Sequence, residues 1–302
     1  MKLPDSFIST IRSTFKEEGE RFLAILPDLI SETSHRWGLT NIQPVSNLSY
    51  NFVAFAKRLG RSAAQSKDVV LKVGVPNREL TSGIAALKFF DGNGACQLLE
   101  SDAEHGLLLL ERLKPGKMLV ELEDDDERTR IAADLISCRG EITSPLLQPQ
   151  LIQLSDWFEG LKKIRPHFNG GTGPFPGKLL EQVESSLPEL FADKNVKLMH
   201  GDFHHFNILS SERGWLVIDP KGVIGPVGYE VGPLMLNPWN SPLDRIRLER
   251  RVSILTEKLG WERESIVKWA TAHAVLSAWW DIQDGMDGGR TIHCAEIFSE
   301  MK

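Results

Sequence analysis

The chain has 302 residues, and its 35 basic and 41 acidic side chains give a formal charge of −6. Hydrophobic residues make up 41 % and charged residues 25 %, close to the averages for globular proteins. The net acidic charge argues against general nucleic-acid binding, and no apolar run approaches the roughly 20 residues of a membrane helix. We therefore expect neither nucleic acid nor a membrane as a partner.

The N-terminus and the cysteines predict a cytoplasmic protein. The first residues, MKLPDSFIST, lack the apolar run and the small-residue cleavage site of a secretory signal. Cys96, Cys138 and Cys294 are widely spaced and odd in number, and none forms a CxxC pair. This pattern argues against a disulfide framework and against a thiolate metal cluster. We expect reduced thiols, and the sequence carries no sign of the oligomeric state.

The first third of the chain alternates between helical and strand-like patterns. A helix is expected from Asp5 to a break at Gly19, and a second from about Glu20 to Trp37, which ends at Gly38. Next come two β-rich runs at 41–58 and 67–76, a helix at about 77–90, and a hairpin of 95–102 with 106–113.

From Lys114 onward most of the sequence has helical periodicity, with a Pro/Gly-rich break at 169–177 and a β-rich island near 215–225. The predicted fold class is α+β with two lobes. Residues 1–111 form an N-terminal lobe of helices and a small sheet, and residues 112–302 form a mainly helical lobe.

An acidic run at 121–127, ELEDDDE, has six carboxylates in seven positions. A calcium or polycation site is one interpretation, but calcium loops place ligands at alternate positions around a glycine turn, and neither feature is present. Carboxylates also stabilise the positive end of a helix. We therefore interpret the run as the start of the helix that follows.

The segment 198–222, LMHGDFHHFNILSSERGWLVIDPKG, places a polar cluster between apolar flanks. The cluster contains His200, Asp202, His204, His205 and Asn207, and Asp219 follows the apolar run 216–218. Buried flanks would present the polar residues as a loop. Such a loop suits chemistry on a phosphate. One carboxylate can accept the proton of an attacking hydroxyl, while an amide and a second carboxylate bind Mg²⁺.

The spacing from Asp202 to Asn207 equals that of the protein-kinase catalytic loop, HRDxxxxN, and Asp219 falls where the DFG aspartate lies. The segments HGDFHHFNIL and GWLVIDPKGVIG resemble the aminoglycoside 6-phosphotransferase and hydroxyurea kinase family, which includes streptomycin phosphotransferases. The resemblance implies a bilobal kinase-like fold, with a small antiparallel sheet in the N-lobe and a mainly helical C-lobe. It also implies ATP and Mg²⁺ as cofactors, and phosphoryl transfer to a hydroxyl of a small molecule, such as streptomycin or hydroxyurea.

The same resemblance implies roles for single residues of the motif. Asp202 would be the catalytic base or orienting carboxylate, and Asn207 and Asp219 would ligate Mg²⁺. His200 would brace the loop by hydrogen bonds.

The resemblance also implies nucleotide ligands in the first lobe. Lys72 would contact the ATP phosphates and pair with Glu79, although a lysine in a strand more commonly marks an exposed face. The Glu111 carbonyl and the Leu113 amide would bind adenine. No GxGxxG motif precedes the second strand, and in its place SNLSYNF at 46–52 offers Ser49, with Asn47 and Asn51, to cover the phosphates.

An acidic and aromatic segment near the C-terminus is the predicted substrate side. Aminoglycosides are polycations, so carboxylates and aromatic faces suit them. Trp280, Asp281 and Asp284 are the candidates, although ordinary core packing and a solvated helix end explain the same pattern. Tyr229 and Glu230 are interpreted as structural.

Other functions remain open from the sequence. The histidines of HxxxHH could form a zinc site of a hydrolase, but the glutamate of HExxH is missing. The loop could be structural, or the chain a nucleotide-binding module without turnover. Within the kinase interpretation, a housekeeping metabolite could replace the antibiotic as substrate.

Overall fold

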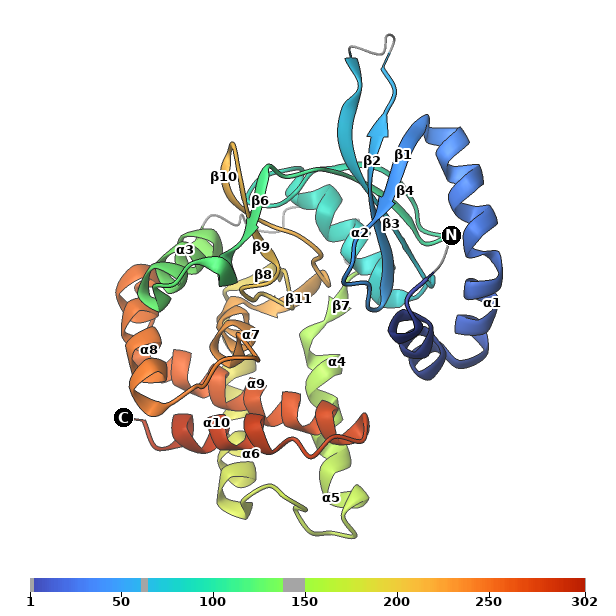
Figure 1. Cartoon of the computed structure of the whole chain (residues 1–302). Coiled ribbons are helices and arrows are strands. Elements are labelled where there is room, and N and C mark those ends of the chain that lie inside the picture. The colour runs from blue at the N-terminus through green and yellow to red at the C-terminus, as the bar shows by residue number, and fades with distance from the viewer. Residues whose placement is uncertain (1–2, 61–64, 138–149, 302) are drawn as a thin grey trace. The chain divides into compact units, whose positions relative to one another are not determined.

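The computed structural model describes residues 3–60, 65–137 and 150–301 (Figure 1). It divides into two compact units, Met1–Lys114 and Pro115–Lys302. Cys138 lies outside the described residues, whereas Cys96 and Cys294 are buried free thiols. Among the residues described, no helix combines the length and the apolar character needed to span a bilayer.

The first unit opens with helix α1, Asp5–Trp37, whose break lies at Lys16 and not at Gly19 as predicted. Lys16 has φ 52° and ψ −125°, which interrupts the helical geometry. Gly19 serves a different purpose, because a Cβ there would lie 2.5 Å from the carbonyl oxygen of Ile11. The glycine therefore lets the two halves of the helix approach each other. The helix ends at Gly38, which has a left-handed conformation, as predicted.

The sheet of the first unit has five antiparallel strands in the order β1-β2-β3-β5-β4. The β-rich run at 41–58 is two strands separated by a turn at 45–50, which overlaps the segment 46–52 expected between the first two strands. The elements of this unit are β1 Leu39–Pro44, β2 Asn51–Arg58, β3 Lys67–Gly74, α2 Arg78–Phe90, β4 Leu98–Asp102 and β5 Leu107–Glu111.

Strand β3 alternates between the two faces of the sheet. Val69, Leu71 and Val73 are fully buried in a core that includes Phe22 and Leu26 of α1. Side chains of a strand point alternately to opposite faces, so Lys72 lies on the face away from this core.

The second unit is mainly helical and contains two small three-stranded sheets, β10-β9-β6 and β7-β11-β8. Helix α9, Arg263–Gln283, is largely buried. The other elements are β6 Pro115–Met118, the 3₁₀ helix η2 Leu119–Glu121, α3 Asp125–Ser137, β7 Ile152–Gln153, α4 Leu154–Phe158, the 3₁₀ helix η4 Glu159–Lys163, α5 Ile164–His167, α6 Gly177–Phe191, β8 Val196–Met199, β9 Ile208–Ser211, β10 Gly214–Val217, β11 Val223–Pro226, the 3₁₀ helix η5 Val227–Glu230, α7 Val231–Leu236, α8 Arg245–Leu259 and α10 Gly289–Ser299. The antiparallel sheet followed by a helical region confirms the predicted fold class.

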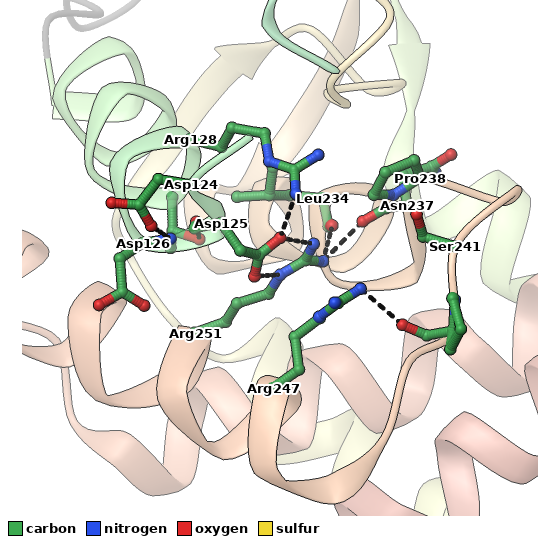
Figure 2. A network of polar contacts seen from close by, with 12 residues as sticks. Asp124, Asp125, Asp126, Arg128, Leu234, Asn237, Pro238, Ser241, Arg247 and Arg251 are labelled. Carbon is green, nitrogen blue, oxygen red and sulfur yellow. Dashed lines mark hydrogen bonds and ion pairs between the residues drawn. The ribbon is translucent and has the colours of Figure 1, made fainter. Parts of the chain in front are cut away.

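The acidic run begins helix α3, as predicted, but it also takes part in an ion-pair network. Asp125 accepts two hydrogen bonds from Arg251 of α8, and Asp126 pairs with Arg250. Figure 2 shows Arg251 between Asp125 and the backbone oxygens of Leu234 and Asn237. The carboxylates therefore connect α3 to α8, a role that the sequence pattern did not reveal.

Candidate active site

The loop at 200–207 connects strands of two different sheets, β8 and β9. Gly201 has φ 82°, and a Cβ on it would lie 2.5 Å from Cγ2 of Val223 in β11. A larger residue would therefore face both an unfavourable backbone conformation and a clash. Glycine at this position therefore lets the loop pass close to β11.

His200 is fully buried and holds this loop through hydrogen bonds of its backbone and its ring. Its backbone N–H donates to Oε1 of Glu230 over 3.1 Å, and its Nδ1 accepts the N–H of Asp202 over 3.2 Å. Its Nε2 lies 2.7 Å from the carbonyl oxygen of Ile218, to which it donates. Since Nδ1 accepts and Nε2 donates, the ring is neutral. The bracing role predicted for His200 agrees with these contacts.

Asp202, His204 and Asn207 are in mutual contact on the loop. Oδ1 of Asp202 lies 3.4 Å from Nε2 of His204, and the Asp202 side chain is 39 % exposed. Nδ2 of Asn207 donates to the Asp202 carbonyl oxygen over 3.0 Å and lies 3.3 Å from Nε2 of His204. With its amide nitrogen engaged in this way, Asn207 has its amide oxygen left for a cation.

Asp219 is brought to the loop by the β9–β10 hairpin. The N–H of Ile218 donates to the carbonyl oxygen of Asn207 over 2.9 Å, which extends the pairing of the two strands. Asp219 follows with φ 58°, a left-handed conformation that aspartate tolerates, and it is exposed. An amide oxygen and a carboxylate are thus presented from neighbouring strand ends, which is the oxygen-donor chemistry that Mg²⁺ prefers.

The zinc alternative is wrong for the part of the chain that the structure describes. No group of three or more His, Cys, Asp or Glu residues there could hold a metal ion. His200 uses both ring nitrogens for the contacts above. His205 is fully buried, and burial together with the nearby Arg251 and Arg128 lowers its pKa far below the usual value.

The charge of Asp202 influences two buried aromatic residues that nothing in the sequence connects to it. The ring centroids of Tyr229 and His273 are 5.2 Å apart, and the charge of Asp202 contributes to the pKa of each. Burial raises the pKa of Tyr229, with a further contribution from Asp202. Burial lowers the pKa of His273 to about 3, although Asp202 opposes this shift. His273 is therefore neutral at physiological pH, and Gly232 packs so closely that a Cβ there would lie 2.5 Å from His273 Cβ.

The predicted nucleotide ligands of the first unit lie on and around its sheet. Lys72 is half-buried on β3, and Glu79 is exposed in the first turn of α2. Ser49 is exposed in the turn between β1 and β2. Glu111 ends β5 and accepts the N–H of Gln97 through its carboxylate, over 2.7 Å. Leu113 is 8 % exposed just after the strand.

The predicted substrate residues differ in how available they are. Trp280 is half-buried on α9 and packs edge to face against Trp157, with ring centroids 5.5 Å apart. Asp281 accepts a hydrogen bond from the Thr291 hydroxyl over 3.1 Å, and burial raises its pKa. Asp284 is exposed at the end of the helix.

An acidic loop residue, an amide and a second carboxylate on this α+β fold define the phosphotransferase class of kinase-like proteins. A sequence model described as "Aminoglycoside/hydroxyurea antibiotic resistance kinase" matches residues 49–285. The chain belongs to this family, and it is therefore an ATP-dependent small-molecule phosphotransferase.

Individual relatives agree with this assignment. The chain is 29 % identical over 290 residues to a streptomycin 6-kinase of Streptomyces glaucescens, covering 94 % of this chain and 92 % of that protein. It is 30 % identical over 269 residues to a hydroxyurea phosphotransferase of Kitasatospora aureofaciens, covering 88 % and 76 %. The fold is that of a thermostable mutant of aminoglycoside phosphotransferase APH(4)-Ia, solved with AMP-PNP and hygromycin B, at a TM-score of 0.57 and 14 % identity, covering 90 % of this chain and 99 % of that one.

Proposed function

We propose that this protein transfers the γ-phosphoryl group of ATP to a hydroxyl of an aminoglycoside of the streptomycin type. The observation that carries the proposal is the loop geometry of Asp202, Asn207 and Asp219 in a chain that matches a streptomycin 6-kinase over nearly its whole length. Hydroxyurea is the second candidate acceptor, because a hydroxyurea phosphotransferase is equally similar.

In the second unit, Asp202 is the proposed base or orienting group for the attacking hydroxyl. Its partly exposed carboxylate accepts a proton as the oxygen–phosphorus bond forms. The Asn207 amide oxygen and the Asp219 carboxylate are the proposed ligands of Mg²⁺. Binding of the ion by these two groups would supply charge neutralisation on the transferred phosphate.

In the first unit, Lys72 is the proposed phosphate ligand, with Glu79 as its ion-pair partner. The Glu111 carbonyl and the Leu113 amide are proposed to bind adenine, and Ser49 to cover the phosphates. Lys72 lies on the sheet face opposite the apolar core, which supports a role outside packing.

Trp280, Asp281 and Asp284 remain proposed contacts to the acceptor. Of the two carboxylates, Asp284 is the better candidate for a cationic group. Burial raises the pKa of Asp281, which also engages Thr291, whereas Asp284 is exposed.

The test of this function is ADP release from ATP and Mg²⁺ with streptomycin, other aminoglycosides, hydroxyurea and simple metabolic alcohols. Asp202→Asn keeps the shape of the side chain and removes its basicity, so we expect a loss of about 10²-fold or more in rate. ATP binding, measured by calorimetry, should change little. Retained turnover in the Asn variant would remove Asp202 from its role, and turnover of metabolic alcohols alone would replace the antibiotic as acceptor.

A further inference from the structure

A tryptophan with 69 % of its surface exposed, Trp239, stands beside the loop that carries the proposed base. Its ring stacks on Phe206 with centroids 6.5 Å apart and planes inclined by 30°. The Phe206 ring in turn contacts that of His204 at 5.9 Å, and His204 lies 3.4 Å from the Asp202 carboxylate. A continuous line of contacts therefore joins Trp239 to Asp202.

The backbone that carries Trp239 is fixed by arginines from two helices. Arg251 donates to the Asn237 carbonyl oxygen over 2.6 Å, and Arg247 to that of Pro242 over 2.7 Å. Figure 2 shows both of these arginines at the loop. Arg290 of α10 donates to the carbonyl oxygens of Leu236 over 2.9 Å and of Pro238 over 3.1 Å.

A single exposed apolar side chain is ordinary and needs no explanation. Trp239 differs because its backbone is held on both sides and because its ring extends an aromatic surface that begins on the catalytic loop. Trp and Tyr faces attract cations, and the Trp face does so most strongly.

We propose that Trp239 and Phe206 form a stacking platform for a planar cationic group of the acceptor, such as a guanidinium. The inference rests on the proposed function and extends it, because it names the feature of the acceptor that this protein selects. Streptomycin carries guanidinium groups, whereas hydroxyurea is small and uncharged. The platform therefore favours the first of the two candidate acceptors.

The experiment compares wild type, Trp239→Leu, Trp239→Phe and the control Trp37→Leu, which removes a half-buried tryptophan of α1. ADP release is measured against streptomycin and hydroxyurea, and streptomycin affinity is measured by calorimetry. For Trp239→Leu we expect KM and Kd for streptomycin to rise about tenfold, with kcat within about twofold. Trp239→Phe should lose less, and hydroxyurea kinetics and Trp37→Leu should match wild type.

The outcomes separate the platform from the proposed function. Wild-type turnover of streptomycin that Trp239→Leu leaves unchanged would overturn the platform and leave the function standing. If wild type does not turn over streptomycin, the proposed function fails, and the Kd values for streptomycin of wild type and Trp239→Leu then test the platform. Affinity that depends on Trp239 would still support the platform, and affinity that is absent or independent of Trp239 would overturn it.

Discussion

His200 holds the loop with a neutral imidazole, one nitrogen accepting from Asp202 and the other donating to Ile218. The loop thus reaches its geometry through the hydrogen bonds of a fully buried side chain. Glu230 fixes the backbone of the same histidine from η5. Interpreting Glu230 as structural agrees with this contact, although the sequence pattern did not indicate its partner.

A single substitution tests the proposed role of Asp219 as a ligand of Mg²⁺. Asp219→Ala should remove the dependence of ATP affinity on Mg²⁺, because it deletes the only carboxylate among the proposed ligands. Titration calorimetry with ATP, with and without Mg²⁺, measures the difference. Asp134→Ala, which removes an exposed carboxylate of α3, is the control and should behave as wild type. Unchanged Mg²⁺-linked affinity in the Asp219 variant would contradict the assignment.

His273 makes the protein sensitive to acid. Its pKa in the folded state is about 3, against 6.5 ordinarily, so between these values only the unfolded chain takes up the proton. The stability contribution of the neutral ring is present at pH 7 and decreases as the pH falls below 6.5. For this group alone we expect a loss of about 2 kcal/mol in unfolding free energy from pH 7 to pH 5.

Denaturant unfolding at pH 7 and pH 5 measures this loss. His273→Asn should remove the part due to His273, while His205, whose pKa is also lowered, retains its own contribution. His293→Asn changes an exposed histidine and should leave the pH dependence as in wild type. An equal pH dependence in wild type and His273→Asn would show that His273 is not protected from protonation.

Among single residues, the sequence predicted those with a fixed spacing within one segment, such as Asp202 and Asn207. It could not connect His273 to them, because contacts between α9 and the loop depend on tertiary packing with no local signal. Trp239 was missed for the same reason. Its neighbour Phe206 is 33 positions away along the chain.

At the level of elements, α3 and α8 are joined by a buried ion pair. The Arg251 side chain is fully buried, and Asp125 accepts hydrogen bonds from it over 2.7 and 2.8 Å. Burial alone would raise the pKa of Asp125, but hydrogen bonds and charges from Arg251 and the charge of Arg128 outweigh it, so the pKa is lowered. The ionised carboxylate therefore stabilises the fold at pH values above its ordinary pKa. This contribution is lost as the pH falls through the lowered pKa of the folded state.

Asp125→Asn should reduce the free energy of unfolding by about 3–5 kcal/mol at neutral pH, because it leaves the buried Arg251 charge without its counter-ion. Denaturant unfolding at pH 7 measures the loss, which should shrink in strongly acid solution. Asp126→Asn removes the partner of the exposed Arg250 and is the matched control, with little change expected. Equal effects of the two substitutions would contradict the network described for α3 and α8.

The elements that were predicted well have strong local patterns. The 3.6-residue period and Gly38 located the end of α1, and the β-rich composition of 67–76 located β3. The misplaced helix break, at Lys16 and not at Gly19, has another origin. A glycine that allows a close approach looks in the sequence like a glycine that ends a helix.

At the scale of the whole molecule, two units divide the chain. The residues proposed for ATP lie in Met1–Lys114, and those proposed for the base and the metal lie in Pro115–Lys302. The fold class followed from the change of periodicity near residue 114, whereas the family could be suggested only by the two motif segments. The acceptor has no comparable sequence signature, because exposed residues such as Trp239 and Asp284 come from separate elements.

The most direct test of the account is to quantify ADP and phosphorylated acceptor in the same reaction, with streptomycin, ATP and Mg²⁺. Phosphorus NMR of the product identifies the new phosphate ester. We predict equal amounts of ADP and phosphorylated streptomycin with wild type, and formation of both at least about 10²-fold slower with Asp202→Asn. Formation of ADP without a phosphorylated acceptor, or equal product from the Asn variant, would contradict the central claim.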